Sequence, residues 1–295
     1  MTIRSAPWAP VPDPLPAPAF DAHTHLDMLT EPVERVLAEA GQAGITRVVT
    51  VGMDVTTSLW AAECAAAHAS VYAAVAIHPN DTAFARDGLD SEGRPTGLAG
   101  IDDVLAEIAR LAAGPKVRAV GETGLDYYRD SAPADLQREW FAAHIEIAKA
   151  TGKALMIHDR EAHEDVLAVL AQEGAPERVI FHCFSGDAEL AKRCADAGYV
   201  MSFAGNVTFP SAGDLREAAV AAPADLILVE TDAPFLTPVP NRGRQNAPAQ
   251  AAHTLRAIAG LRGMDPADLC AAVEATGRRV FGAFDDDPAS AADSS

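Results

Sequence analysis

The stretch Phe20-Asp21-Ala22-His23-Thr24-His25-Leu26-Asp27 decides how the rest of the chain is interpreted. Successive side chains of an extended strand alternate between its two faces, so His23 and His25 lie on the same face. Two neutral imidazoles on one face offer two nitrogen donors to one divalent cation. The same spacing also occurs in ordinary strands, so the pair gains meaning only if other metal-binding residue types lie near it in the fold.

The composition limits the class of protein. The chain has 295 residues, of which 49% are hydrophobic, and this fits one (βα)8 barrel of about 250 residues with short tails. The 42 acidic and 23 basic residues give a formal net charge of -19. Such a charge argues against extended, nonspecific binding of nucleic acid or anionic membrane, although it is compatible with one local site for an anion.

The cysteines and the N-terminal segment predict a soluble, cytoplasmic protein. Cys64, Cys183, Cys194 and Cys270 show no Cys-x-x-Cys spacing, so we expect reduced, mostly buried thiols. The N-terminal segment has no basic region followed by an apolar core, as a signal peptide would. No apolar run approaches the roughly 18 residues of a membrane span, so we expect no membrane partner.

Eight short apolar segments alternate with helix-like segments along the chain. Strands each followed by a helix predict parallel pairing through right-handed crossovers, and eight such units predict an α/β fold of the (βα)8 TIM-barrel type. No glycine-rich phosphate loop follows the first strand, which disfavours an open nucleotide-binding sheet. The strands are expected to end at 23–25 and to cover 46–51, 71–77, 117–121, 154–158, 179–182, 199–203 and 226–230.

The chain is expected to form a single domain with short disordered tails. The barrel domain is predicted over residues 19–283, between a proline-rich leader (1–18) and an acidic disordered tail (284–295). The leader has little periodicity, so it has no core of its own. The glycine-rich connection between residues 78 and 101 is expected to be a long loop.

Metal-binding residue types fall at the carboxyl ends of five predicted strands, where the active site of such a barrel lies. A single histidine at a strand end is more often a packed, hydrogen-bonded residue than a ligand. Convergence from five separate strands is hard to attribute to chance, and it favours a metal centre. The residues are His23, His25, Glu122, His158, His182 and Asp232.

Several motifs resemble those of the TatD-type metal-dependent deoxyribonucleases, a family of the amidohydrolase superfamily. The resemblance covers about Phe20 to Phe281, with the motifs in the family's order, and it implies a TIM barrel with two divalent metals. The motifs are Asp21-Ala22-His23-Thr24-His25-Leu26-Asp27, Ile77-His78-Pro79, Gly121-Glu122-Thr123-Gly124-Leu125-Asp126-Tyr127-Tyr128, His182-Cys183-Phe184-Ser185-Gly186, Glu230-Thr231-Asp232-Ala233-Pro234 and the basic loop Pro238–Asn246.

The resemblance also implies a division of the ligands. His23, His25 and Asp232 would bind one metal, His158 and His182 the other, and Glu122 would bridge them. Two metals activate a water for in-line attack on a phosphodiester, and Asp232 could accept its proton, so Glu122 and Asp232 are the expected catalytic residues. This mixed nitrogen and oxygen donor set suits Zn²⁺ or Mn²⁺ at least as well as Mg²⁺, so the identity of the metal stays open.

Four residues near the strand ends are expected to contact the substrate. Arg160, Arg242 and Arg244 are candidates for bidentate phosphate contact, and His78 could touch a phosphate or fix its loop. Tyr127 and Tyr128 could stack on a base. Asp126 and Glu230 are expected to orient ligand histidines or to cap loops.

The preferred function is therefore a metal-dependent nuclease that hydrolyses phosphodiester bonds of DNA as an exonuclease acting at strand ends. Its expected partner is single-stranded DNA or a strand end, with RNA as an open alternative and the oligomeric state undecided. A binuclear hydrolase of an amide, ester or aminoacyl-tRNA bond stays open, because the same metal pair would activate water for it. The arginines of the basic loop favour phosphate. A non-catalytic barrel would have no use for six ligands.

Overall fold

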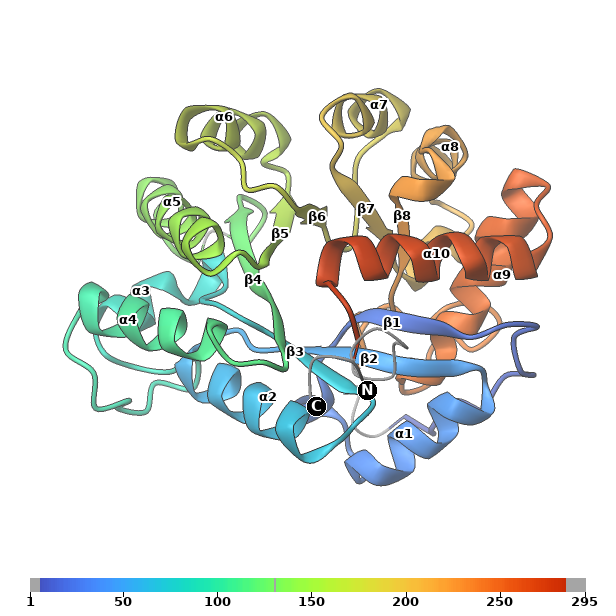
Figure 1. Ribbon diagram of the computed structural model, residues 1–295, viewed down its shortest axis with the longest axis horizontal. Coiled ribbons are helices and arrows are strands. Elements are labelled where there is room, and N and C mark those ends of the chain that lie inside the picture. Colours follow the sequence, from blue (N-terminus) through green and yellow to red (C-terminus); the bar gives the residue numbers. More distant parts are fainter. Residues whose placement is uncertain (1–5, 130, 285–295) are drawn as a thin grey trace, which may run out of the picture.

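The computed structural model describes residues 6–129 and 131–284, and its centre is one sheet of eight parallel strands in the order β1 to β8 (Figure 1). This confirms the predicted TIM barrel. The fourth and fifth strands run past their predicted ends. The strands are β1 (Ala19–Thr24), β2 (Ile45–Val51), β3 (Val71–Val75), β4 (Val117–Asp126), β5 (Ala154–Arg160), β6 (Val179–Phe181), β7 (Val200–Phe203) and β8 (Ile227–Val229).

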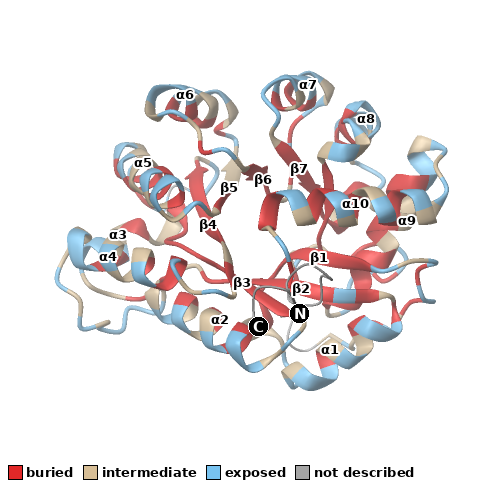
Figure 2. Cartoon of the chain, viewed as in Figure 1, coloured by how far each residue is buried: buried red, intermediate tan, exposed pale blue. Residues whose placement is uncertain are grey.

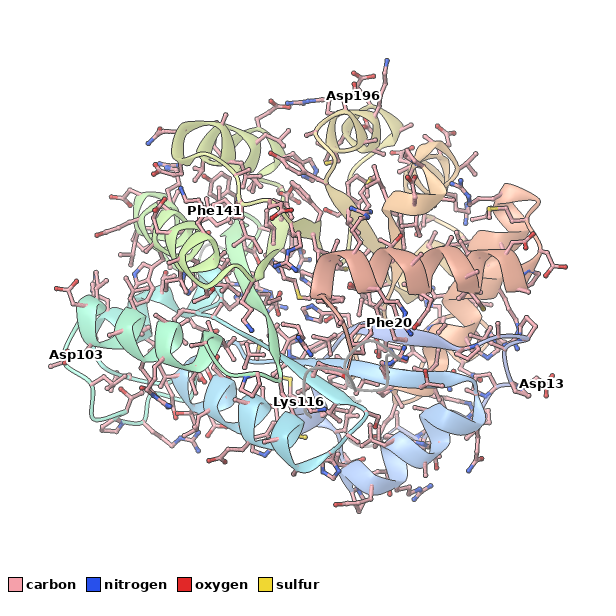
Figure 3. All side chains as sticks on the ribbon, in the orientation of Figure 1. Asp13, Phe20, Asp103, Lys116, Phe141 and Asp196 are labelled. Atoms are coloured by element: carbon pink, nitrogen blue, oxygen red, sulfur yellow. The ribbon has the colours of Figure 1, made fainter. Side chains whose placement is uncertain are left out.

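Helices surround the strands as an outer layer. Figure 2 shows the strands and the inner faces of the helices buried and the outer faces exposed, as expected for amphipathic helices packed on a sheet. Phe141 is completely buried, whereas Asp103 and Asp196 lie at the periphery of the molecule in Figure 3. The helices are α1 (Val33–Gln42), α2 (Val55–Ala67), α3 (Thr82–Arg86), α4 (Ile101–Ala112), α5 (Ala134–Thr151), α6 (His163–Glu173), α7 (Ala188–Asp196), α8 (Gly213–Ala221), α9 (Ala251–Arg262) and α10 (Pro266–Phe281).

The connection after β3 is not the uninterrupted loop that its glycines predicted. It begins with a 3-10 turn, Pro79–Asp81, followed directly by helix α3. Proline is favoured at the first position of such a turn, and the His78 side chain accepts a hydrogen bond from the Asn80 backbone N–H.

Within the described residues, none of the helices combines the length and apolarity needed to cross a membrane.

The first and last strands are joined through Asp21. Its carboxylate accepts hydrogen bonds from the backbone N–H and the hydroxyl of Thr231. An isolated bridge also pairs Thr24 with Ala233, and the His25 N–H donates to the Ala233 carbonyl at 2.8 Å. These contacts hold the His-x-His stretch of β1 beside the segment that follows β8.

Helix α10 packs against β1 and β8. Gly277 of this helix has no room for a side chain, because a Cβ there would lie 2.1 Å from the ring of Phe20, and Phe20 lies beside α10 in Figure 3. Phe284, which the sequence placed in the tail, is only 1% exposed and lies 4.9 Å from the Tyr72 ring, centroid to centroid. The packed part of the chain therefore extends to Phe284. Residues 285–295 of the predicted tail lie outside the described residues.

Residues 6–18 of the proline-rich leader lie against the barrel. Trp8 donates its indole N–H to Glu39 at 2.7 Å. Leu15 is buried in the barrel core, and its N–H donates to the Ala43 carbonyl at 3.0 Å. These two apolar side chains anchor a segment whose prolines favour extended backbone.

Candidate metal centre

The predicted ligands converge at the carboxyl end of the barrel, around a cavity of about 580 Å³. Five of them line the cavity, and the sixth, His23, is completely buried behind it. The six residues lie within or shortly after five different strands, so the parallel order of the strands brings them together. The five lining residues are His25, Glu122, His158, His182 and Asp232.

The first half-site consists of His23, His25 and Asp232. The Nε2 atoms of the two histidines lie 3.3 Å apart. Asp232 Oδ1 lies 3.8 Å from Nε2 of His23 and 3.6 Å from Nε2 of His25. These separations place three potential ligand atoms around one point.

The second half-site consists of His158 and His182. His182 Nε2 lies 3.4 Å from His158 Nδ1. Both nitrogens face the same carboxylate oxygen, Oε2 of Glu122, at 2.8 Å from His182 and 3.1 Å from His158.

Glu122 lies between the two half-sites. Its other oxygen, Oε1, is 3.5 Å from Nε2 of both His23 and His25. Burial alone would raise the pKa of this carboxyl, but the neighbouring imidazoles, His182 foremost, outweigh burial and hold the pKa well below its usual range. One ionised carboxylate thus presents one oxygen to each half-site.

The carboxylates at the centre raise the pKa of two of the imidazoles. Burial would lower the pKa of His25, yet the carboxylates of Asp232 and Glu122 raise it to about 9. The pKa of His182 is likewise raised, by Glu122 and Glu230, against the effect of burial. Without a metal, protons would supply the positive charge that the carboxylates attract. Facing nitrogens and shared carboxylate oxygens form a donor set that fits divalent cations.

Three of the four histidines in the two half-sites direct their second ring nitrogen to an oxygen. His25 Nδ1 contacts the Val51 carbonyl at 3.0 Å, His182 Nδ1 contacts Glu230 at 3.2 Å, and His158 Nε2 contacts Asp126 at 3.2 Å. Such contacts fix the tautomer and the ring orientation of a metal ligand. Asp126 and Glu230 therefore occupy the orienting positions predicted for them.

His78 lies on the wall of the cavity beside the second half-site. Its Nδ1 accepts the Asn80 N–H at 3.1 Å, while Nε2 lies 3.4 Å from His158 Nδ1 and 3.8 Å from Glu122 Oε2. Burial, and then His158, lower the pKa of His78 to about 3. A neutral His78 thus carries its hydrogen on Nε2, where it can donate to a substrate oxygen.

The predicted arginines separate into two places. Arg160 lines the cavity, with its guanidinium 4.0 Å from the centre of the Tyr128 ring. Arg242 instead stacks at 4.1 Å on Phe209, and neither it nor Arg244 belongs to the cavity lining. The sequence did not single out Arg129, which lines the cavity. Its position just after β4, the strand that carries Glu122, was the available signal.

The two tyrosines that follow Asp126 differ in their surroundings. Tyr127 donates its hydroxyl to Asp165 at 2.6 Å, so it serves the packing of β4 against α6. Tyr128 is 59% exposed and carries Arg160 on its ring. Of the two, only Tyr128 has the exposure that stacking on a base would need.

Comparison with known proteins identifies the family. The model of the family described as TatD related DNase matches residues 20–282. The chain belongs to the TatD family. TatD of Mycobacterium tuberculosis, described as an uncharacterized metal-dependent hydrolase, is 44% identical over 271 residues, which cover 89% of this chain and 97% of that protein. YabD of Bacillus subtilis, described in the same words, is 36% identical over 266 residues, which cover 89% of this chain and 98% of that protein.

A solved structure of a TatD homolog supports the same conclusion. YjjV from Escherichia coli superposes with a TM-score of 0.79 at 25% identity, covering 90% of this chain and 98% of that one. With the clusters of potential ligands around the cavity, these likenesses make the chain a metal-dependent hydrolase of the TatD family.

Proposed function

We propose that this TatD-family hydrolase is a nuclease that cleaves phosphodiester bonds of DNA and removes nucleotides from strand ends. The observation that carries the proposal is the position of Glu122, whose two oxygens face two separate groups of imidazoles. His23, His25 and Asp232 would hold one divalent ion, and His158 and His182 a second, with Glu122 shared between them.

Two divalent ions in such a site activate a water and stabilise the charge that develops on the phosphate oxygens. The protein's own groups would then position the substrate and move protons. Asp232 is placed to accept a proton from the attacking water while it contributes to the first half-site. His78 would donate its Nε2 hydrogen to a phosphate oxygen, because its Nδ1 is held by the Asn80 N–H.

Two arginines on the wall of a cavity that also carries five carboxylates support a phosphate-bearing substrate. Arg129 and Arg160 line it, and Arg160 is held over Tyr128. Since the chain carries a net charge of -19, only such local cations and bound metals would attract DNA. A cavity of about 580 Å³ suits a terminal nucleotide better than a long strand. The name of the matched family supports DNA as the substrate.

A reducing location is proposed on separate grounds. The four cysteines are all free, and three of them are buried. Free thiols of this kind are typical of proteins in a reducing compartment such as the cytoplasm.

A panel of end-labelled substrates tests the nuclease proposal. Protein stripped with a chelator and reloaded with Mn²⁺, Mg²⁺ or Zn²⁺ is incubated with single-stranded DNA, duplex DNA and RNA. We expect single nucleotides to be released from DNA ends, and Glu122→Gln to release none. Absence of cleavage of every nucleic acid by fully loaded protein would refute the proposal, and turnover of an ester, amide or aminoacyl-tRNA would favour the alternative.

The salt dependence of binding tests how many phosphates are held. In Glu122→Gln, an end-bound single strand should contact two to four phosphates, which gives a slope of log affinity against log salt of roughly -1.5 to -3. Arg160→Gln should make the slope shallower by about 0.7. The double variant Arg242→Gln/Arg244→Gln tests the predicted basic loop in the same assay. A slope near roughly -6 would reveal a long binding groove instead.

A further inference from the structure

His23 differs from the other three ligand histidines in what lies behind it. Its Nδ1 faces the thioether sulfur of Met156 at 3.2 Å, whereas the other three second nitrogens face oxygen atoms. The His23 ring is completely buried. A buried ring nitrogen needs a hydrogen-bond partner, and the Met156 sulfur lies within reach of Nδ1.

Met156 reaches His23 because of its place in the barrel. It lies on β5 two residues before His158, so both side chains leave the same face of the strand. Neighbouring β4 approaches it closely, since a Cβ on Gly121 would lie 2.4 Å from the Met156 Cβ. Met156 is completely buried, which holds its sulfur in the barrel interior beneath the candidate metal centre.

We propose that Met156 is a positioning residue for the first half-site, with its thioether accepting a hydrogen bond from the Nδ1–H of His23. A neutral imidazole carries one hydrogen, and a thioether can only accept. The contact therefore keeps the hydrogen on Nδ1 and leaves the lone pair of Nε2 free to bind a cation. The inference rests on the metal centre of the proposed function, but it does not depend on DNA being the substrate.

The sulfur also makes the basicity of His23 differ from that of His158 and His182. A carboxylate behind a ligand imidazole raises its basicity, as Asp126 and Glu230 would for His158 and His182. A thioether is a much weaker acceptor, so it orients His23 without adding negative charge behind it. Removing Met156 should therefore weaken only the half-site that contains His23, and by less than the loss of a carboxylate would.

Stepwise titration with Mn²⁺ tests the proposal on the full-length, metal-free protein. Loss of an outer partner typically lowers metal affinity about 10- to 100-fold. We expect Met156→Leu to weaken one of the two binding steps by about 5- to 10-fold and to leave the other within about twofold. Glu230→Gln, which alters the partner of His182, should weaken the other step. Met201→Leu, a substitution at a buried methionine of β7, is the matched control and should change neither step.

The outcomes distinguish this inference from the proposed function. If the wild-type protein binds fewer than two Mn²⁺ ions, the two-metal centre itself is wrong. If it binds two, and Met156→Leu changes neither step, both steps, or the same step as Glu230→Gln, only the role of Met156 is overturned. Nitrogen-15 NMR of the metal-free wild type gives an independent reading that needs no variant. His23 should show the Nδ1–H tautomer, and the Nε2–H tautomer would overturn the proposal.

Discussion

The two half-sites contain the same number of histidines, but they place negative charge differently. In the first, Asp232 itself lies among the potential ligand atoms, 3.6 Å from His25 Nε2. The groups behind its two histidines, the Val51 carbonyl and the Met156 thioether, are uncharged. The first half-site thus has its own carboxylate in direct reach of a cation.

The second half-site reverses this arrangement. Within residues 6–129 and 131–284, the carboxylates that contact His158 and His182 are the shared Glu122 and the two behind the rings, Asp126 and Glu230. Apart from Glu122, the negative charge of this half-site therefore lies behind the imidazole rings and acts on a bound cation through them. The two half-sites should therefore respond to different substitutions, even though one carboxylate joins them.

The largest effect should come from the group that both sides share. Glu122→Gln keeps the shape of the side chain but removes its charge, so the bridge between the half-sites is lost. We expect bound metal to fall from two ions to one or none, with a loss of affinity greater than the roughly 100-fold typical of an outer partner. Hydrolysis should disappear. Metal analysis that finds two tightly bound ions, with near-normal turnover, would contradict the bridging role.

A matched pair of variants should then separate the sides. His25→Ala removes a nitrogen from the first half-site, and His158→Ala removes one from the second. Each should abolish one Mn²⁺ binding step and largely retain the other, as measured by titration of the metal-free proteins. Loss of both ions in both variants would mean that the half-sites bind metal only together, and the division into two independent half-sites would be wrong.

A smaller effect is expected from the charge behind the second half-site. Asp126→Asn preserves the shape of a side chain that accepts the Asn80 amide at 2.9 Å and contacts His158 at 3.2 Å. Because it removes the outer charge and replaces the acceptor that faces His158 with a donor, we expect the second half-site to lose about 10- to 100-fold in metal affinity and the first to be spared.

Asp159→Asn provides the control for this prediction. Asp159 lies on the same strand as His158, but its carboxylate pairs with His163 at 2.7 Å and contacts no ligand histidine. It should leave both binding steps unchanged. Equal losses in the two variants would show that any charge near the cavity has the same effect, and the contact between Asp126 and His158 would then have no special part.

The sequence was sufficient for the barrel and for the convergence of the six potential ligands. Both follow from rules that need no distances: side chains alternate along a strand, and parallel strands end at one rim. The length of strand β4 was harder to predict. Pairing of Gly124 with His158 continues this strand past Glu122 to Asp126, and the register between β4 and β5 shifts between Val120 and Thr123.

Contacts between side chains that are far apart in the chain could not be predicted from the sequence. Spacing placed Arg242 in a basic loop, but it could not show that Phe209, from the segment after β7, holds its guanidinium away from the cavity lining. The contact between Met156 and His23 could be predicted in part, because Met156 shares a strand face with His158. Which nitrogen faces which acceptor depends on ring orientation, and residue type alone does not determine that.

The smallest effect on the metal centre is expected at a histidine that belongs to neither half-site. His144, on α5, is completely buried. Its Nδ1–H donates to the Trp140 carbonyl at 2.6 Å, and its Nε2 accepts the N–H of Ile77, the residue before His78, at 3.1 Å. A second proton would have to sit on Nε2, facing a donor. Burial accordingly lowers the pKa of His144 to about 4.

This shift opposes that of His25, whose raised pKa of about 9 gives stability at low pH that is lost as the pH rises. The lowered pKa of His144 gives stability that is complete above the unfolded pKa of about 6.5 and is lost as the pH falls through 4.

His144→Gln keeps an acceptor and a donor but cannot titrate. The free energy of unfolding of metal-free wild type should therefore fall by up to about 3 kcal/mol more than that of the variant between these two pH values. Comparing the two proteins cancels the half-site histidines, which both retain. Parallel curves of unfolding free energy against pH would show that His144 is not the titrating group, and altered Mn²⁺ binding at pH 7 would tie it to the metal centre after all.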